Sequence, residues 1–179
     1  ASYVYSKATG NRDNTFGTDI AWGADPHDPN NYINAYGNLT NDPTHMIKLQ
    51  GTYVLPFDIS FNAYLRGITG NAWTTRVRTY AFNQGRITFF AEPRGSNHYD
   101  MQKILDLRLE KIFTLAQKYR LGIMVDVFNV FNADTITNWG TRIGYDWYDE
   151  PDYLPSTDGH TLYGIVRPRQ ARVGIRLIF

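Results

Sequence analysis

Charged and aliphatic side chains alternate, residue by residue, through the middle of several segments of this chain. Residues 105–110 read Leu-Asp-Leu-Arg-Leu-Glu, and residues 171–177 read Ala-Arg-Val-Gly-Ile-Arg-Leu. Successive side chains of a β-strand point to opposite faces of its sheet, so each segment predicts a strand with one apolar and one ionic face. The pattern therefore predicts an all-β fold.

The same alternation divides the chain into six predicted strands. They lie at about residues 1–9, 44–55, 58–67, 101–113, 118–131 and 165–179. Short connections near 55–58 and 116–117 alternate with long polar stretches at 10–42, 68–100 and 132–163. Transmembrane barrels sort their connections in this way, with tight turns at one rim and long loops at the other.

The sorting favours an antiparallel transmembrane β-barrel, with lipid outside and a polar lumen inside. We expect Leu107, Ile123 and Ile175 on the outer wall. We expect Arg108, Met124 and Arg176 on the inner wall. A one-sided sheet of a soluble protein also alternates, so a soluble β-sandwich stays open as an alternative.

The composition argues against several classes of function. The formal net charge is +1, which does not indicate a nucleic-acid partner, and the chain has no cysteine for a disulfide or a thiol nucleophile. Aromatic residues make up 15% of the chain, and those near strand ends are expected to form interfacial girdles. These are Tyr3, Tyr5, Tyr53, Phe57, Phe113, Tyr119 and Phe179.

No catalytic or metal motif stands out. The chain has no Ser/His/Asp set, phosphate loop or nucleotide fingerprint, and its histidines lack metal-ligand spacing. They are His27, His45, His98 and His160, expected as ordinary loop residues. Asp25, Asp28, Asn30 and Asn31 offer oxygen ligands for Ca²⁺ but lack the EF-hand order. We expect neither enzymatic activity nor a cofactor.

Two groups of residues are candidates for a role. One group is predicted to share the polar face as a cross-strand salt-bridge ladder in the lumen. It consists of Asp106, Arg108, Glu110, Asp126, Arg172 and Arg176. The other lies in an acidic, aromatic loop suited to stacking on sugars or gripping peptides, or simply to packing. It consists of Trp139, Tyr145, Trp147, Tyr148 and Tyr153. Asn129 and Asn132 are expected to mark a strand-to-loop transition.

An ordered set of segments carries a resemblance to a known family. They are HMIKLQGTYVLP at 45–56, AEPRGS at 91–96, ILDLRLEKIF at 104–113, DVFNVFN at 126–132 and RPRQARVGIRLIF at 167–179. Together they resemble the C-terminal barrel of TonB-dependent outer-membrane receptors. The likeness is greatest to the Oar-like group, whose full-length members carry a carboxypeptidase-regulatory-like domain.

The resemblance implies that residues 1–179 are the C-terminal part of a barrel of about 22 strands. A TonB box and a plug domain are not recognisable, so we expect a fragment of a longer receptor for active uptake of an unidentified ligand. Its location would be the bacterial outer membrane. Its partners would be outer-membrane lipid, the barrel-assembly machinery, which reads the terminal Phe179, and, in the full-length protein, TonB and the plug. A passive pore, a structural barrel and a soluble secreted sandwich that binds carbohydrate remain alternatives.

Overall fold

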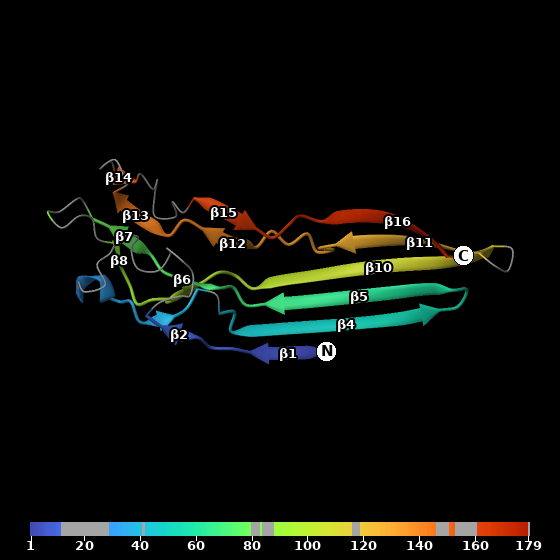
Figure 1. The fold of residues 1–179 in the computed structure, drawn as a ribbon, viewed down its shortest axis with the longest axis horizontal. Helices are drawn as coiled ribbons and strands as arrows, with labels where there is room; N and C mark the ends of the chain where they lie inside the picture. Colours follow the sequence, from blue (N-terminus) through green and yellow to red (C-terminus); the bar gives the residue numbers. More distant parts are fainter. Residues whose placement is uncertain are drawn as a thin grey trace.

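The main body of the molecule is a six-stranded antiparallel sheet (Figure 1). The computed structural model describes residues 1–11, 29–40, 42–79, 83, 88–115, 119–145, 151–152 and 161–178. The strands follow one another in space in chain order: β1 (Ser2–Tyr5), β4 (His45–Leu55), β5 (Ile59–Ile68), β10 (Gln102–Leu115), β11 (Tyr119–Phe128) and β16 (Gln170–Ile178). The prediction of an all-β fold built from antiparallel strands is confirmed. No helix among the described residues is long and apolar enough to cross a membrane.

The register of this sheet separates two kinds of side chain. Leu109 lies opposite Phe61 on one neighbour and Val125 on the other, whereas Arg108 lies opposite Asn62 and Asp126. Every pair in the sheet matches odd with odd or even with even residue numbers. Because side chains alternate along a strand, all odd-numbered residues share one face, called here the apolar face. The even-numbered residues share the other, called the polar face.

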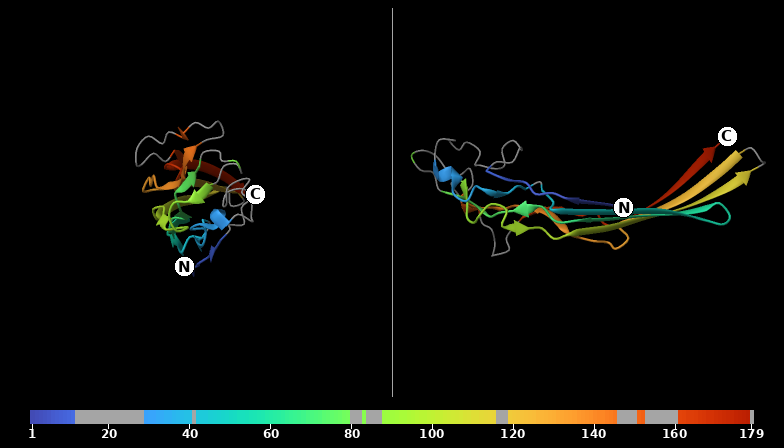
Figure 2. Two further views of the ribbon diagram at one scale, coloured as in Figure 1. Left: turned by 90° about the vertical axis from the view of Figure 1, so that its left-hand side faces the viewer. Right: turned by 90° about the horizontal axis from the view of Figure 1, so that it is seen from below.

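The sheet is a single curved layer, seen edge-on in the right-hand view of Figure 2. On the apolar face Val173 is 69% exposed and Ile175 is 73% exposed. Ile123 is also exposed, and Leu107, in a central strand, is half-buried. In the described chain no second sheet covers this face, as a sandwich would require. The predicted division between Leu107, Ile123 and Ile175 on one side and Arg108, Met124 and Arg176 on the other is confirmed by the register.

The two ends of the sheet differ as the connection lengths predict. Residues 56–58 join β4 to β5, and Leu115 pairs with Tyr119 at the same end of the sheet (Figure 1). Phe57 and Asp58 both have positive φ, at 67° and 58°, a left-handed conformation that non-glycine residues adopt mainly in turns. The described parts of the three long connections all lie at the opposite end, called here the loop end.

The long connections contain more structure than the sequence suggests. We expected plain loops, but many of their described residues lie in short strands or a 3₁₀ turn. These are β2 (Thr9–Gly10), η1 (Pro29–Tyr32), β3 (Gly37–Asn38), β6 (Ala72–Trp73), β7 (Arg76–Arg78), β8 (Thr88–Phe90), β9 (Asn97–His98), β12 (Ile136–Trp139), β13 (Arg142–Tyr145), β14 (Pro151–Asp152) and β15 (Leu162–Ile165). The pair β6–β9 keeps the register of β5–β10 without a shift, so that hairpin extends into the loop end.

Three predicted strand boundaries are wrong. The first strand ends at Tyr5 rather than residue 9, and the last begins at Gln170 rather than 165. The fifth ends at Phe128 because Asn129, with φ of 50°, leaves the extended conformation. Asn132, with φ of 52°, completes the turn by donating its N–H to the Asn129 carbonyl at 2.8 Å. The expected strand-to-loop transition at these two asparagines is confirmed.

Candidate functional site

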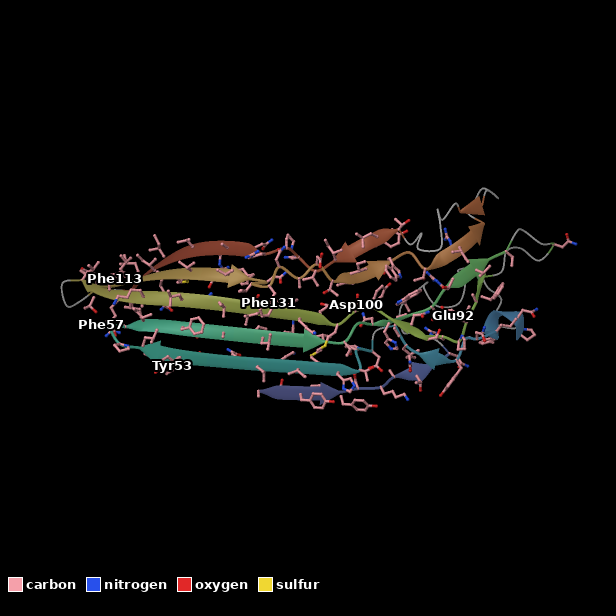
Figure 3. All side chains as sticks on the ribbon, turned by 180° about the vertical axis from the view of Figure 1, so that it is seen from behind. Tyr53, Phe57, Glu92, Asp100, Phe113 and Phe131 are labelled. Atoms are coloured by element: carbon pink, nitrogen blue, oxygen red, sulfur yellow. The ribbon has the colours of Figure 1, made fainter. Side chains whose placement is uncertain are left out.

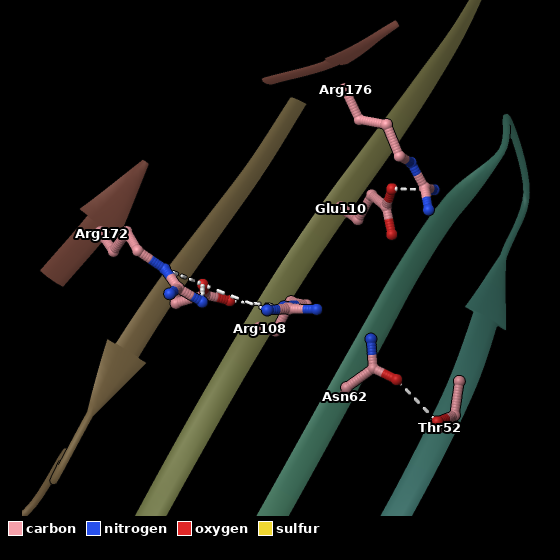
Figure 4. A network of polar contacts seen from close by, with 7 residues as sticks. Thr52, Asn62, Arg108, Glu110, Arg172 and Arg176 are labelled. Carbon is pink, nitrogen blue, oxygen red and sulfur yellow. Dashed lines mark hydrogen bonds and ion pairs between the residues drawn. The ribbon is translucent and has the colours of Figure 1, made fainter. Parts of the chain in front are cut away.

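Asp126 is the centre of an ion-pair network on the polar face. It stands in the middle of β11, between Arg108 on β10 and Arg172 on β16 (Figure 4). Arg108 Nε donates to Asp126 Oδ1 at 2.5 Å, and Arg172 Nη2 donates to Oδ2 at 2.7 Å. The Asp126 residue is only 2% exposed, whereas both arginines reach solvent. One buried carboxylate therefore ties three neighbouring strands together.

A second ion pair bridges strands that are not adjacent. Arg176 Nη2 on β16 donates to Glu110 Oε1 on β10 at 2.6 Å, and the contact passes over β11. Gly122 of β11 lies beneath it, and a Cβ there would come within 3.1 Å of Glu110 Oε1. A side chain at 122 would fill the space in which the pair meets. A glycine inside a strand often marks a close approach, but its role was not predicted.

Asp106 is the one predicted member of the ladder that these ion pairs leave out. Its Oδ1 accepts the backbone N–H of Asn129 at 2.8 Å, at the point where β11 ends. The carboxylate therefore fixes the strand-to-loop transition. The other five ladder residues, which are Arg108, Glu110, Asp126, Arg172 and Arg176, are brought together.

The polar face also carries a shallow hollow of about 460 Å³ over β5 and β10. Tyr64, Arg108 and Glu110 are among its lining residues. Nearby, Thr52 Oγ1 on β4 donates to Asn62 Oδ1 at 2.6 Å (Figure 4). Polar contacts on this face thus join β4 to β5 and, separately, β10, β11 and β16.

A second candidate site is a cavity of about 430 Å³ at the loop end. Three aromatic rings form a cluster in its wall: Trp73 at the end of β6, Tyr99 after β9, and Trp139 at the end of β12. The Trp73 and Trp139 rings meet edge to face with centroids 5.1 Å apart, and Tyr99 meets Trp139 at 5.4 Å. Two of the long connections supply these rings.

Tyr99 is held in place by polar contacts to β12. Its hydroxyl donates to Asn138 Oδ1 at 3.4 Å and accepts the backbone N–H of Trp139 at 3.2 Å. Burial raises the pKa of the Tyr99 hydroxyl above its ordinary value, against the opposing effects of the Trp139 N–H and the nearby Arg76. The hydroxyl is therefore a neutral group at physiological pH.

The cavity lies beside a tight contact between two connections. Gly37 forms an isolated parallel bridge with Arg94, and a Cβ on Gly37 would lie 1.9 Å from the Arg94 carbonyl oxygen. Only glycine fits at this position. The buried Arg94 guanidinium donates to the Asn11 carbonyl at 2.7 Å and lies 5.5 Å from the centroid of the Phe90 ring.

The residues predicted for ligand contact are only partly described. Trp139 lines the cavity, and the backbone of Tyr145 lies at the end of β13. Trp147, Tyr148 and Tyr153 lie outside the described residues, as does Phe179. Trp73 and Tyr99, which join Trp139 in the cavity wall, were missed because they are distant from it in sequence.

The histidines and the oxygen-rich loop can be assessed as metal ligands only where the structure describes them. Within the described ranges, no group of three or more His, Cys, Asp or Glu side chains could hold a metal ion. His27, His160, Asp25 and Asp28 lie outside those ranges. The expectation that His45 is a loop residue is wrong: it begins β4, and its ring accepts or donates a 2.8 Å hydrogen bond with the Tyr3 hydroxyl.

Comparisons with known proteins add no relative: no protein-family model matches the chain, and neither curated proteins nor solved structures give a significant match.

Proposed function

We propose that this chain forms part of the wall of a β-barrel in a bacterial outer membrane, in a receptor of the TonB-dependent class. The observation that supports it most is the exposed apolar face. Large aliphatic side chains cover that face of the sheet, while the opposite face carries buried and solvated ion pairs. Water on both sides would make such a face costly, whereas lipid on one side makes it favourable.

The length of the strands suits a membrane. β4 has 11 residues, β5 has 10 and β11 has 10, and a tilted transmembrane strand needs about 9–11. In the described strands of the sheet, only Lys103 and Lys111 bring a Lys, Arg, Asp or Glu side chain to the apolar face. They are eight residues apart on β10, or about 27 Å along the strand. That is comparable with the apolar band of about 25 Å in outer-membrane barrels.

Lys111 and its neighbours have the character of a membrane interface. The Lys111 ammonium donates to the Phe57 carbonyl and lies 5.5 Å from the centroid of the Phe113 ring. Tyr53, Phe57 and Phe113 are exposed toward the turn end of the sheet (Figure 3). Amphipathic lysine and aromatic side chains favour the boundary between lipid and water.

The rest of the barrel must come from further strands. β1 and β16 are the edge strands of the sheet, and the outer edge of each pairs with no described strand. An open edge in lipid leaves backbone groups without hydrogen bonds. We propose that a longer chain supplies the remaining strands of a barrel of about 22. In such a receptor a plug fills the lumen and ligand enters from the loop end. TonB, powered from the inner membrane, drives uptake.

The proposal is tested with the full-length protein expressed in a bacterium that has an outer membrane. We expect it in the outer-membrane fraction as a band whose mobility changes on heating. Planar-bilayer recording then separates receptor from pore: a plugged receptor leaves the bilayer closed, whereas a passive pore gives steady conductance. Recovery of the protein in the periplasm or culture medium would contradict the membrane location and favour a secreted sandwich.

The C-terminal residue gives a second test. We propose that Phe179 is read by the barrel-assembly machinery, so Phe179→Ala should lower the amount of heat-modifiable barrel several-fold. Arg176→Ala, on the polar face of β16, should lower it less. Equal assembly of the wild type and Phe179→Ala would remove the support for an assembly signal.

A further inference from the structure

The loop-end cavity combines features of a ligand site. Its volume of about 430 Å³ lies within the range of about 300–1,000 Å³ of small-molecule sites. Trp73 and Tyr99 come from the connection between β5 and β10, and Trp139 and Tyr163 from the connection between β11 and β16. The cavity is therefore formed where two hairpin extensions meet.

The aromatic rings of the wall offer flat apolar surface. Trp73, Trp139 and Tyr99 lie with centroids between 5.1 and 6.1 Å apart, so each ring holds the others in fixed orientations. Rigid aromatic surface binds the apolar face of a ring at a small cost in conformational entropy.

The polar lining is rich in neutral hydrogen-bonding groups and cations. Asn71, Thr74 and Asn138 contribute amide and hydroxyl groups, and Arg76 and Arg94 contribute the charges. Arg76 Nε donates to Thr141 Oγ1 at 3.3 Å, and both residues line the cavity. This hydrogen bond fixes the orientation of the Arg76 guanidinium in the cavity wall. No Asp or Glu occurs among the described lining residues.

We propose that this cavity binds an acidic saccharide of mono- or disaccharide size. The aromatic rings stack on the sugar, the amide and hydroxyl groups bind its hydroxyls, and Arg76 binds its carboxylate. This proposal names the class of ligand that the proposed receptor would take up. Binding itself does not depend on the proposed function; only the transport that follows binding does. A peptide fits less well because its ammonium group requires a carboxylate, which the described lining lacks.

The test is a titration of the full-length protein, purified in detergent, with digalacturonic acid. Lactose serves as the neutral disaccharide and the dipeptide Phe-Asp as the alternative ligand. Calorimetry gives the affinity, and the part of the tryptophan fluorescence change that is lost in Trp139→Ala reports on the cavity. We expect digalacturonic acid to bind about tenfold or more tightly than lactose, as one charge-assisted hydrogen bond provides.

Two variants and one control assign the site. Trp139→Ala should weaken binding of both sugars about tenfold. Arg76→Gln should abolish the preference for the acid, and Arg76→Lys should restore part of it. Arg167→Gln, an exposed arginine that does not line the cavity, should change nothing. A mobility change on heating verifies that each variant is folded.

Equal binding of acid and neutral sugar would overturn the inference, as would a preference for the dipeptide or unchanged binding by Trp139→Ala and Arg76→Gln. A protein that resides in the outer membrane but binds neither sugar would overturn it and leave the proposed function intact. Binding by a protein located elsewhere would retain this site and overturn the proposed location.

Discussion

The six-stranded sheet and the loop end use the same antiparallel pairing, yet they distribute apolar side chains in opposite ways. At the loop end the buried apolar residues lie inside the protein, among them Ala35, Ala72, Phe90 and Val166. In the sheet, Ile104 is the one apolar side chain among the described residues that is fully buried, and it lies on the polar face. The loop end therefore contains its own core, whereas the sheet leaves its large apolar side chains exposed.

The two regions are also connected differently. The sheet is a succession of antiparallel strands that follow one another in chain order, held by hydrogen-bond ladders and by one buried carboxylate. The loop end is held by contacts between different connections, such as the parallel pairing of β7 with β13 and the bridge from Gly37 to Arg94. Substitutions in the two regions should thus have different consequences.

The largest effect is expected at Asp126. Asp126→Ala leaves Arg108 and Arg172 without their common partner, and breaking a buried ion pair costs about 3–5 kcal/mol. Because both arginines reach solvent, we expect about 3 kcal/mol, measured by urea unfolding in detergent. Glu110→Gln removes a more exposed pair and should cost about 1 kcal/mol or less. Equal losses would mean that the buried carboxylate has no special role in the sheet.

A charge on the apolar face should be nearly as costly. Val125 is 41% exposed on that face, and an arginine near the middle of a lipid bilayer costs about 2–4 kcal/mol. Val125→Arg should therefore lower the unfolding free energy by that amount in bilayers. Met124→Arg, one residue earlier on the polar face, should have little effect. If water bathes both faces, the two variants will behave alike, which would contradict the membrane assignment.

Asn129, at the junction of the two regions, should give a smaller effect. Asn129 is only 3% exposed. Its side-chain amide donates to the carbonyls of Ala133 and Arg167, and its side-chain oxygen accepts the Ala133 N–H. Asn129→Ala should cost about 2 kcal/mol, through lost hydrogen bonds and a left-handed backbone that alanine disfavours.

The matched control is Asn132→Ala, because Asn132 has the same backbone conformation but is exposed and accepts only the Arg169 N–H among the described contacts. It should cost about 1 kcal/mol. Thermal unfolding of the two variants separates the effect of backbone strain from that of the buried bonds. Equal destabilisation would assign the whole effect to the backbone.

The sequence predicted the sheet well and the loop end poorly, for a physical reason. Alternation is a local signal, so the six strands, their faces and the sorting of the turns follow from neighbouring residues. The meeting of Trp73 with Trp139 depends on how two distant connections pack, and no local pattern reports it. Likewise, the role of Gly122 becomes visible only when Glu110 and Arg176 are seen to meet above it.

The central claim is that the apolar face of the sheet meets lipid and the polar face meets water. The chain has no cysteine, so a single cysteine placed along β11, with any cysteine elsewhere in the full-length protein replaced, carries a nitroxide label at one known position. In the full-length protein reconstituted into bilayers, we expect labels at Leu121, Ile123 and Val125 to be accessible to oxygen dissolved in lipid. Labels at Arg120, Met124 and Phe128 should instead be accessible to a water-soluble nickel complex. The account predicts that both accessibilities alternate with a period of two residues, and that the oxygen accessibility is high where the nickel accessibility is low. Low accessibility to both reagents at the odd positions, as in a packed core, would contradict it.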